Sequence, residues 1–153
     1  MAAAAANAKA GLILMHSTAA PEAMQQKEYL TGADPTAAVA AFLDRQLALA
    51  LTVGVKREAV MLDVGIGFGK TREGNYELLR RAEWFEHRFE LPFLWGVSRK
   101  SLLKSEPDNM EKRIAGSLAL AVKLAERKVA ALRVHDVAQT LAALRAAYEL
   151  EQP

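Results

Sequence analysis

The 153-residue sequence contains no cysteine and only three histidines. The absence of cysteine excludes disulfides, thiolate nucleophiles and cysteine-ligated zinc or iron–sulfur sites. The histidines, His16, His87 and His135, show no HxxxH or similar spacing, which argues against a histidine-based metal site. The 20 basic and 18 acidic side chains leave a net charge of +2, too small a surplus to indicate a nucleic-acid-binding surface.

Long apolar runs are also absent. No run approaches the roughly 20 residues that span a bilayer, and the opening MAAAAANAKA lacks the basic start of a signal peptide. We therefore expect no membrane segment and a cytoplasmic location. With 52% hydrophobic and 25% charged residues, the composition is typical of one globular domain.

Four short apolar runs alternate with longer helical patterns. The runs cover residues 12–15, 59–62, 93–97 and 129–134, and their nearly continuous apolar character predicts buried parallel strands. Helices are predicted over the opening alanine run, from Pro35 to a stop at Gly54 with Asp34 as N-cap, over 73–88, over 111–127, and after Asp136 as a further N-cap. This alternation predicts a single α/β domain over residues 1–153, with right-handed crossovers between its strands.

Polar side chains follow each predicted strand. Ligand sites of parallel α/β folds lie beyond the carboxyl ends of the strands. The polar segments there are His16-Ser17-Thr18, Asp63 to Thr71, Ser98 to Ser101, and Arg133 to Asp136. We expect these segments to meet and form one ligand site.

The segment that begins at Asp63 carries glycines at positions 65, 67 and 69, which would let backbone approach a ligand without interference from Cβ atoms. It does not complete a GxxxxGK[ST] phosphate loop, because Val64 stands where the first glycine would fall. The GxGxxG fingerprint fails as well, because Lys70 or Arg72 occupies its last glycine position. We interpret Asp63 as a carboxylate that accepts paired N–H donors of a ligand; the alternative is that it braces the turn.

Two pairs of side chains predict an anion-binding rim. Ser98 and Lys100 are two positions apart, as are Arg133 and His135, so each pair would share one side of an extended strand end. Barrels frequently hold phosphate at the loops after their last two strands. His87 has no such partner and lies in the charged stretch EWFEHR, which predicts a surface position.

At these residues the sequence resembles the dihydropteroate synthase family. The matching strings are LDVGIGFGKT at 62–71, GVSRKS at 96–101, RIAGSLA at 113–119, LRVHDVAQT at 132–140 and, more loosely, LMHSTAAPEAMQ at 14–25. They correspond to the C-terminal half of the family's chain. The resemblance implies a TIM-barrel-like α/β fold with about four βα units, the C-terminal half of a (β/α)8 barrel. It also implies a transferase of folate biosynthesis that joins 6-hydroxymethyl-7,8-dihydropterin pyrophosphate to p-aminobenzoate and releases pyrophosphate.

The resemblance assigns roles to individual residues. The pterin-binding residues would be Asp63, Lys100, Arg133, Met15 and Gly96, of which Asp63 and Lys100 are also the expected catalytic residues. The p-aminobenzoate site would comprise Phe68, Ser98 and Gly67, and the pyrophosphate site Arg133 and His135. No residue of this chain is expected to ligate a metal; Mg²⁺ is expected with the pyrophosphate substrate, through a ligand in the family's N-terminal half.

The sequence departs from the family pattern at several positions. Val64 replaces a proline, Ser17 and Ala19 replace a methionine and a glycine, and Trp95 replaces a smaller aliphatic residue. Four strands cannot close a barrel, so we expect exposed strand edges, an exposed apolar inner face, and association with further copies or with a separate chain that supplies the N-terminal half.

Three functions remain open. The chain could be a dihydropteroate synthase that needs the missing half. It could instead be a non-catalytic fragment or paralogue that binds pterin or phosphate or acts as an assembly partner. The third function is that of another pterin-binding barrel, such as a methyltetrahydrofolate methyltransferase, against which the strings SRKS and RVHD argue.

Overall fold

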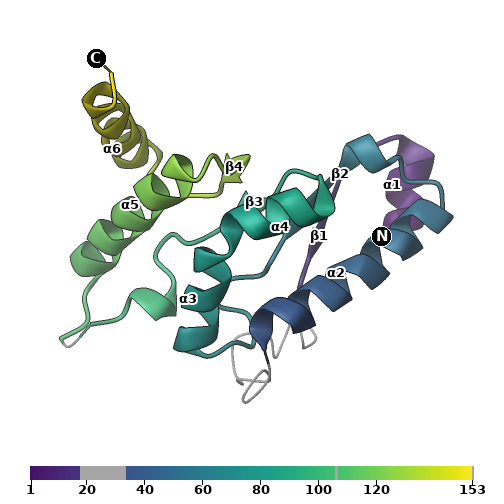
Figure 1. The fold of residues 1–153 in the computed structure, drawn as a ribbon, viewed down its shortest axis with the longest axis horizontal. Helices are drawn as coiled ribbons and strands as arrows, with labels where there is room; N and C mark the ends of the chain where they lie inside the picture. The colour runs from purple at the N-terminus through teal and green to yellow at the C-terminus, as the bar shows by residue number, and fades with distance from the viewer. Residues whose placement is uncertain (18–33, 106, 153) are drawn as a thin grey trace.

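The computed structural model of the chain describes residues 1–17, 34–105 and 107–152 (Figure 1). The strands are β1 (Leu12–Met15), β2 (Val60–Asp63), β3 (Leu94–Trp95) and β4 (Ala131–Leu132). The helices are α1 (Ala2–Ala8), α2 (Pro35–Thr52), α3 (Arg72–Arg80), α4 (Ala82–Phe89), α5 (Met110–Glu126) and α6 (Val137–Leu150), with single 3₁₀ turns at Arg57–Ala59 and Ser101–Leu103. None of the helices in the described ranges is long and apolar enough to cross a membrane.

The four strands lie side by side in parallel and in chain order. β1 pairs with β2 in a register that sets Met15 opposite Asp63, an isolated bridge joins Leu62 to Phe93, and β3 pairs with β4. This parallel arrangement in chain order confirms the predicted half-barrel of βα units. The last two strands are shorter than predicted, because the chain leaves the ladder after Trp95 and turns at residues 98–99.

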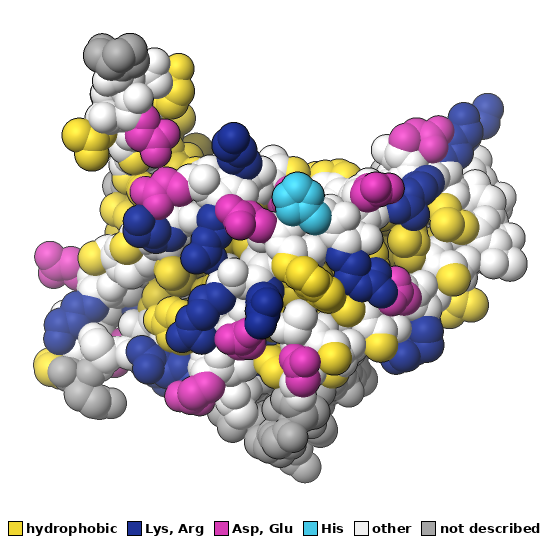
Figure 2. Space-filling view, in the orientation of Figure 1, with side chains coloured by type: hydrophobic (Ala, Val, Ile, Leu, Met, Phe, Trp, Pro, Cys, Tyr) yellow, Lys and Arg dark blue, Asp and Glu magenta, His cyan; other side chains and the backbone are white. Residues whose placement is uncertain are grey.

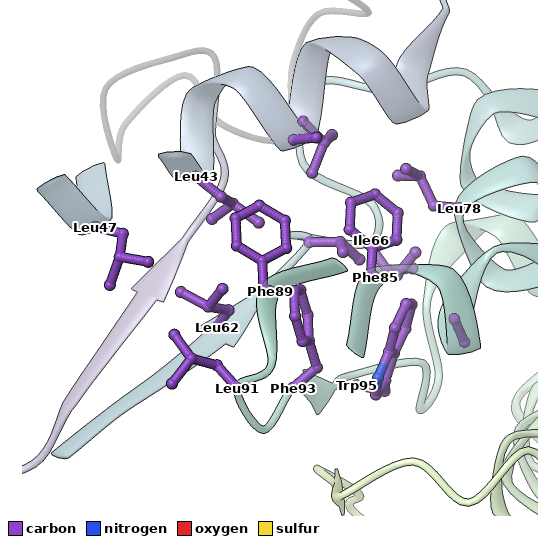
Figure 3. Close-up of a cluster of buried hydrophobic side chains, with 14 of the residues drawn as sticks. Leu43, Leu47, Leu62, Ile66, Leu78, Phe85, Phe89, Leu91, Phe93 and Trp95 are labelled. Carbon is purple, nitrogen blue, oxygen red and sulfur yellow. The ribbon is translucent and has the colours of Figure 1, made fainter. Parts of the chain in front are cut away.

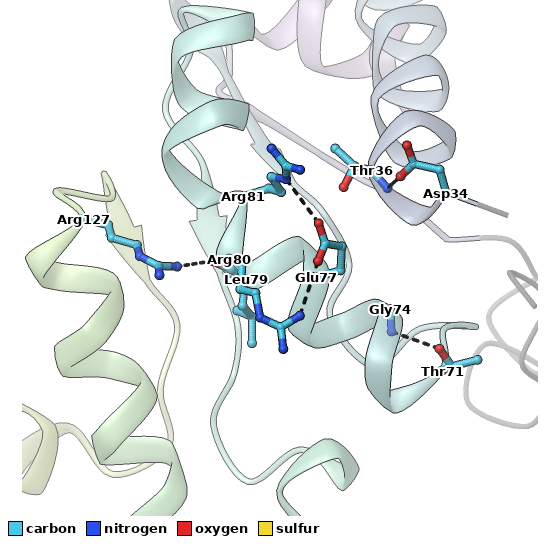
Figure 4. A network of polar contacts seen from close by, with 9 residues as sticks. All are labelled: Asp34, Thr36, Thr71, Gly74, Glu77, Leu79, Arg80, Arg81 and Arg127. Atoms are coloured by element: carbon cyan, nitrogen blue, oxygen red, sulfur yellow. Dashed lines mark hydrogen bonds and ion pairs between the residues drawn. The ribbon is translucent and has the colours of Figure 1, made fainter. Parts of the chain in front are cut away.

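The helix predicted over residues 73–88 is divided into α3 and α4. The backbone N–H of Arg81 donates to the carbonyls of both Glu77 and Leu78, which tightens the last turn of α3 toward 3₁₀ geometry and ends it. The Glu77 carboxylate contacts both Arg80 and Arg81 at this point (Figure 4). The prediction of one continuous helix was therefore wrong.

The predicted N-caps have different outcomes. Asp34 caps α2 as predicted: its Oδ1 accepts the backbone N–H of Thr36 at 2.8 Å (Figure 4) and that of Ala37 at 3.3 Å. Asp136 precedes α6, but its side chain makes no capping bond. Its carboxylate pairs with Arg99 instead, so the predicted cap was wrong.

The hydrophobic core lies between the strands and the layer of α2, α3 and α4 (Figure 3). Its aromatic part comprises Phe85, Phe89, Phe93 and Trp95, whose neighbouring rings lie 5.7–6.4 Å apart between centroids. The indole N–H of Trp95 reaches Glu86 Oε1 at 3.4 Å. The large residue at position 95 is thus accommodated on the helix side of the strands, and the outer face of the helix layer mixes basic with acidic side chains (Figure 2).

The opposite face of the strands remains partly uncovered. Leu12 and Val60 are buried, whereas Ile13, which follows Leu12 in the strand and points to the other face, is 50% exposed. Its register partner Met61 is partly exposed as well. An apolar side chain of the inner face is therefore exposed, as the half-barrel led us to expect.

Candidate functional site

A cavity of about 700 Å³ lies at the carboxyl ends of β3 and β4. Its wall contains seven of the predicted site residues, namely Gly67, Phe68, Gly96, Ser98, Lys100, Arg133 and His135. Arg99, Ser101 and Arg113, which received no ligand-binding role from the sequence, also line it. Three of the four polar segments that were expected to meet therefore do so at the cavity. The fourth segment contributes neither His16 nor Ser17 to the cavity wall, and Thr18 lies outside the described residues.

The cavity wall is strongly cationic. It carries Arg99, Lys100, Arg113 and Arg133, and no carboxylate is among the described residues that line it. Arg99 and Arg113 are each paired with an aspartate that does not line the cavity. Lys100 belongs to no ion pair within the described ranges, so its charge is available to an anionic ligand.

Lys100 lies across the glycine segment that follows β2. Its Nζ is 4.1 Å from the centroid of the Phe68 ring, a cation–π distance. A Cβ at Gly67 would lie 3.2 Å from Lys100 Cδ, so the glycine makes room for the lysine stem. Burial and the nearby Arg133 lower the pKa of Lys100, while Asp63 acts in the opposite direction.

Asp63 is buried next to the cavity rather than in its wall. Its Oδ1 accepts the backbone N–H of Gly65 at 2.7 Å, and its Oδ2 lies 3.9 Å from Arg133 Nη2. Burial raises the pKa of Asp63, opposed by the Gly65 hydrogen bond and by three nearby cations. One oxygen therefore braces the turn, as the alternative interpretation predicted, and the other faces the cationic side.

Met15 lies opposite Asp63 in the β1–β2 register and is likewise outside the cavity wall. The structure therefore places Met15 opposite Asp63 but not in the cavity wall with Gly96, Lys100 and Arg133. Ala19 and the end of the 14–25 string lie outside the described residues.

Ser98, Arg133 and His135 meet where β3 and β4 end. The Ser98 hydroxyl accepts the backbone N–H of His135 at 3.2 Å and lies 3.0 Å from its ring Nδ1. A Cβ at Gly96 would lie 2.8 Å from Arg133 Nη2, so this glycine gives the guanidinium its place. The prediction that Ser98 and Lys100 share one side of an extended strand end was wrong, because residues 98–99 form a turn.

Lys70 holds the glycine segment through hydrogen bonds to its backbone, a role that was not predicted from the sequence. The side chain is buried, and its Nζ donates to the carbonyls of Gly65 at 2.7 Å and Phe68 at 2.9 Å. Asn75 Oδ1 accepts the N–H of Gly67 at 2.7 Å from the side of α3. Burial lowers the pKa of Lys70 to about 7, although Asp63 acts to raise it. The only sequence signal was the position of this lysine directly after the glycines.

The predicted reason for the glycines needs correction at Gly65. Its φ is +69°, and a Cβ there would lie 1.9 Å from the carbonyl oxygen of His16. The missing side chain thus accommodates neighbouring backbone rather than a ligand. His16 is buried against Phe42, with ring centroids 4.8 Å apart, and burial, with a smaller effect of Lys70, lowers its pKa to about 4. His87 is exposed, as predicted.

Comparison with known proteins identifies relatives for this geometry. The family described as pterin binding enzyme matches residues 1–135. Dihydropteroate synthase of Escherichia coli (strain K12) is 38% identical over 143 residues, which cover 93% of this chain and 50% of the relative.

Solved structures agree with this similarity. The dihydropteroate synthase of Stenotrophomonas maltophilia with active site-bound imidazole has a TM-score of 0.88 at 35% identity, covering 98% of this chain and 56% of that one. The enzyme of Anaplasma phagocytophilum with bound 6-hydroxymethylpterin-monophosphate has a TM-score of 0.87 at 30% identity, covering 98% and 59%. The chain spans about half the length of the curated relatives it matches.

Proposed function

The chain belongs to the family of pterin-binding enzymes, and we propose that it carries half of a dihydropteroate synthase site as one partial-barrel domain. The reaction would condense 6-hydroxymethyl-7,8-dihydropterin pyrophosphate with p-aminobenzoate. The observation that carries this proposal is the cationic cavity in which residues after β2, β3 and β4 converge. A pterin that bears phosphate combines an aromatic ring with an anion, and the cavity offers Phe68 beside Lys100, Arg133 and His135. A cytoplasmic location is part of the same proposal.

The leaving group would be stabilised by the cationic end of the cavity. As the bond between the pterin methylene carbon and the pyrophosphate oxygen breaks, its electron pair leaves with pyrophosphate. Arg133 and His135 are placed to bind that growing negative charge, and Lys100 adds a further cation next to the pterin. Prearranged charges of this kind lower a barrier because they need no reorganisation during the reaction.

Asp63 would bind the electron-poor pterin. Its Oδ2, which faces Arg133 rather than the turn, can accept N–H donors of the aminopyrimidine edge. A carboxylate at that edge favours the positive charge that develops on the pterin methylene as pyrophosphate leaves. Met15 and Gly96 would complete the pterin site, Met15 from β1 and Gly96 by admitting Arg133 beside the ring.

The p-aminobenzoate would lie along Phe68 and Gly67, with Ser98 as a hydrogen-bonding group. Its amine nitrogen attacks the methylene carbon and then loses a proton, which forms the C–N bond of the product. Lys100 lies over Phe68 and Ser98 contacts His135, so the two substrates would meet between these side chains.

Mg²⁺ would enter with the pyrophosphate substrate. Among the described residues, no group of three or more His, Asp or Glu side chains is placed to hold a metal ion. Cations line the cavity, so these residues do not fit a resident Mg²⁺ site, which favours oxygen ligands. The binding and charge-stabilising roles proposed above are therefore assigned to side chains of this chain and not to a metal ion that it holds.

The chain would act in an assembly. Ile13 exposes an apolar side chain on the inner strand face, and four strands leave two edges for further pairing. We propose that either a second copy or a separate chain with the N-terminal half of the barrel covers this face. Sedimentation of the purified chain at micromolar concentration tests the first arrangement, and a monomeric mass would contradict it.

Pyrophosphate release by the purified chain tests the activity, with the pterin pyrophosphate, p-aminobenzoate and Mg²⁺ supplied. We expect release that Lys100→Ala abolishes and that Lys128→Ala, an exposed lysine outside the cavity wall, leaves intact. Release only after addition of a polypeptide with the N-terminal half of the Escherichia coli relative would show that the site needs the other half. If the chain releases no pyrophosphate in either case but binds 6-hydroxymethylpterin monophosphate, it is the non-catalytic binder. If it binds neither substrate, the proposal is wrong.

A further inference from the structure

Arg99 has an unusual backbone conformation in the middle of the site. Its φ is +57°, in the left-handed region that residues with a Cβ seldom occupy. It stands between Ser98 and Lys100, and all three line the cavity. Strained residues persist only where the surrounding structure holds them, so the contacts of Arg99 are informative.

Three groups hold Arg99. Its backbone N–H donates to Ser117 Oγ at 2.8 Å, and its carbonyl oxygen accepts a bond from Arg113 Nη1 at 3.4 Å. Its guanidinium makes two bonds to the Asp136 carboxylate, one of them from Nε to Oδ2 at 3.0 Å. Ser117 is itself oriented, because its hydroxyl donates to the carbonyl of Arg113 at 2.6 Å. Every polar group of this residue's backbone is therefore engaged.

The left-handed turn separates the two neighbouring side chains. In an extended segment, residues two positions apart point to the same side. Here Ser98 instead contacts His135 at the end of β4, whereas Lys100 lies over Phe68 after β2. One strained residue thus distributes two polar side chains to two walls of the cavity.

We propose that Ser117, Arg113 and Asp136 are positioning residues, which hold Arg99 in its left-handed conformation and thereby place Lys100 and Ser98 for substrate. The placement is a property of the fold; only its meaning for substrate rests on the proposed function. It also explains the string RIAGSLA, since Arg113 and Ser117 are four residues apart on one face of α5 and reach the same turn.

A pair of substitutions separates backbone conformation from side-chain charge. Arg99→Gly and Arg99→Val both remove the ion pair with Asp136, but glycine adopts positive φ freely whereas a β-branched residue does not. The readout is the ring-current shift that Phe68 imposes on the ε-methylene protons of Lys100, measured by ¹H–¹³C NMR of the full chain without ligand. Phe68→Leu defines the shift in the absence of the ring.

We expect Arg99→Gly to keep most of this ring-current shift and Arg99→Val to lose more than half of it. Lys128 provides a matched control, because it also has a φ of +57° at the end of α5 but does not line the cavity. Lys128→Gly and Lys128→Val should leave the shift unchanged. An Arg99→Val variant that is folded and retains the full shift would overturn the proposal.

Ser117 gives a second test that does not depend on Arg99→Val being folded. Ser117→Ala removes the acceptor of the Arg99 N–H, and Ser117→Thr retains a hydroxyl. We expect Ser117→Ala to lose the ring-current shift and to bind inorganic pyrophosphate at least fivefold more weakly in calorimetry, with Thr restoring both. Lys128→Val should lower thermal stability without changing pyrophosphate binding, which separates positioning from loss of fold.

The two proposals fail in different ways. If the unmodified chain does not bind pyrophosphate, the assigned ligand is wrong, and the ring-current shift still decides the placement of Lys100. If pyrophosphate binds but Ser117→Ala changes neither the affinity nor the shift, the positioning role is wrong and the proposed function stands.

Discussion

The guanidinium of Arg133 lies 3.9 Å from Oδ2 of Asp63 and joins the end of β4 to the end of β2. The Arg133 side chain is 55% exposed, whereas that of Asp63 is 4% exposed. The largely exposed Arg133 cation thus partly compensates for the desolvation of the buried Asp63 carboxylate, whose pKa is raised chiefly by burial. A ligand with N–H donors would add hydrogen bonds to that carboxylate. We infer that the buried Asp63 lowers the stability of the free chain and serves ligand binding.

Asp63→Asn should therefore separate binding from stability. The amide oxygen can still accept the Gly65 N–H, but an amide NH₂ would face the donors of a pterin. We expect at least a tenfold loss of affinity for 6-hydroxymethylpterin monophosphate, with an unfolding free energy within about 1 kcal/mol of the parent. Because the folded-state pKa of Asp63 is raised, ionisation above pH 3.8 destabilises the fold, and the substitution removes this contribution. Titration calorimetry and urea denaturation measure the two effects; an unchanged affinity would remove Asp63 from the site.

Lys70 should make stability rise with pH on the alkaline side. Its pKa is about 7 in the fold against an ordinary 10.5, so the folded chain releases the proton first and gains stability as pH rises from 7 toward 10.5. At about 1.4 kcal/mol per unit of pKa, the gain amounts to several kcal/mol. Urea denaturation at intervals over this range should show the rise in the parent and in Lys128→Met, and a flatter profile in Lys70→Met. Equal slopes in all three would contradict the burial of a titrating Lys70.

His16 should limit stability on the acidic side. Its pKa is lowered from 6.5 to about 4, so the unfolded chain takes up a proton first and stability falls as pH drops from 6.5 to 4. His16→Phe keeps a ring against Phe42 and should remove this loss. His87→Gln, at an exposed position, should retain it. Thermal unfolding between pH 4 and 7 measures the effect, and an identical acid profile in His16→Phe would count against it.

Gly65 should not tolerate a side chain. A Cβ would lie 1.9 Å from the His16 carbonyl oxygen, in a backbone conformation with φ +69°, so we expect Gly65→Ala to cost more than about 3 kcal/mol of unfolding free energy. Gly54→Ala is the matched control: φ is +92°, but the nearest atom to the added Cβ is 3.9 Å away. That variant should lose only about 1–2 kcal/mol. If Gly65→Ala and Gly54→Ala lose similar unfolding free energy in urea denaturation, the backbone where β1 and β2 end shifts to accommodate the added methyl group.

The sequence predicted best those features that depend on neighbouring residues. β1 has the predicted bounds, and Asp34 caps α2, because apolar runs and capping bonds are local. The division between α3 and α4 at Arg81 was missed, because a continuous apolar stripe does not reveal where the hydrogen bonding changes. Asp136 has the pattern of a cap, yet it pairs with Arg99, 37 positions away.

At the site, the residue types and their order could be read from the sequence: a carboxylate before three glycines, and a serine, lysine, arginine and histidine at two later strand ends. How these groups are arranged around the cavity, in contrast, follows from contacts in the folded chain. The left-handed turn at Arg99 sends Lys100 and Ser98 to different walls, and the His16 carbonyl explains Gly65. These outcomes depend on contacts between segments that meet only after the parallel strands have formed, and no spacing within one segment encodes them.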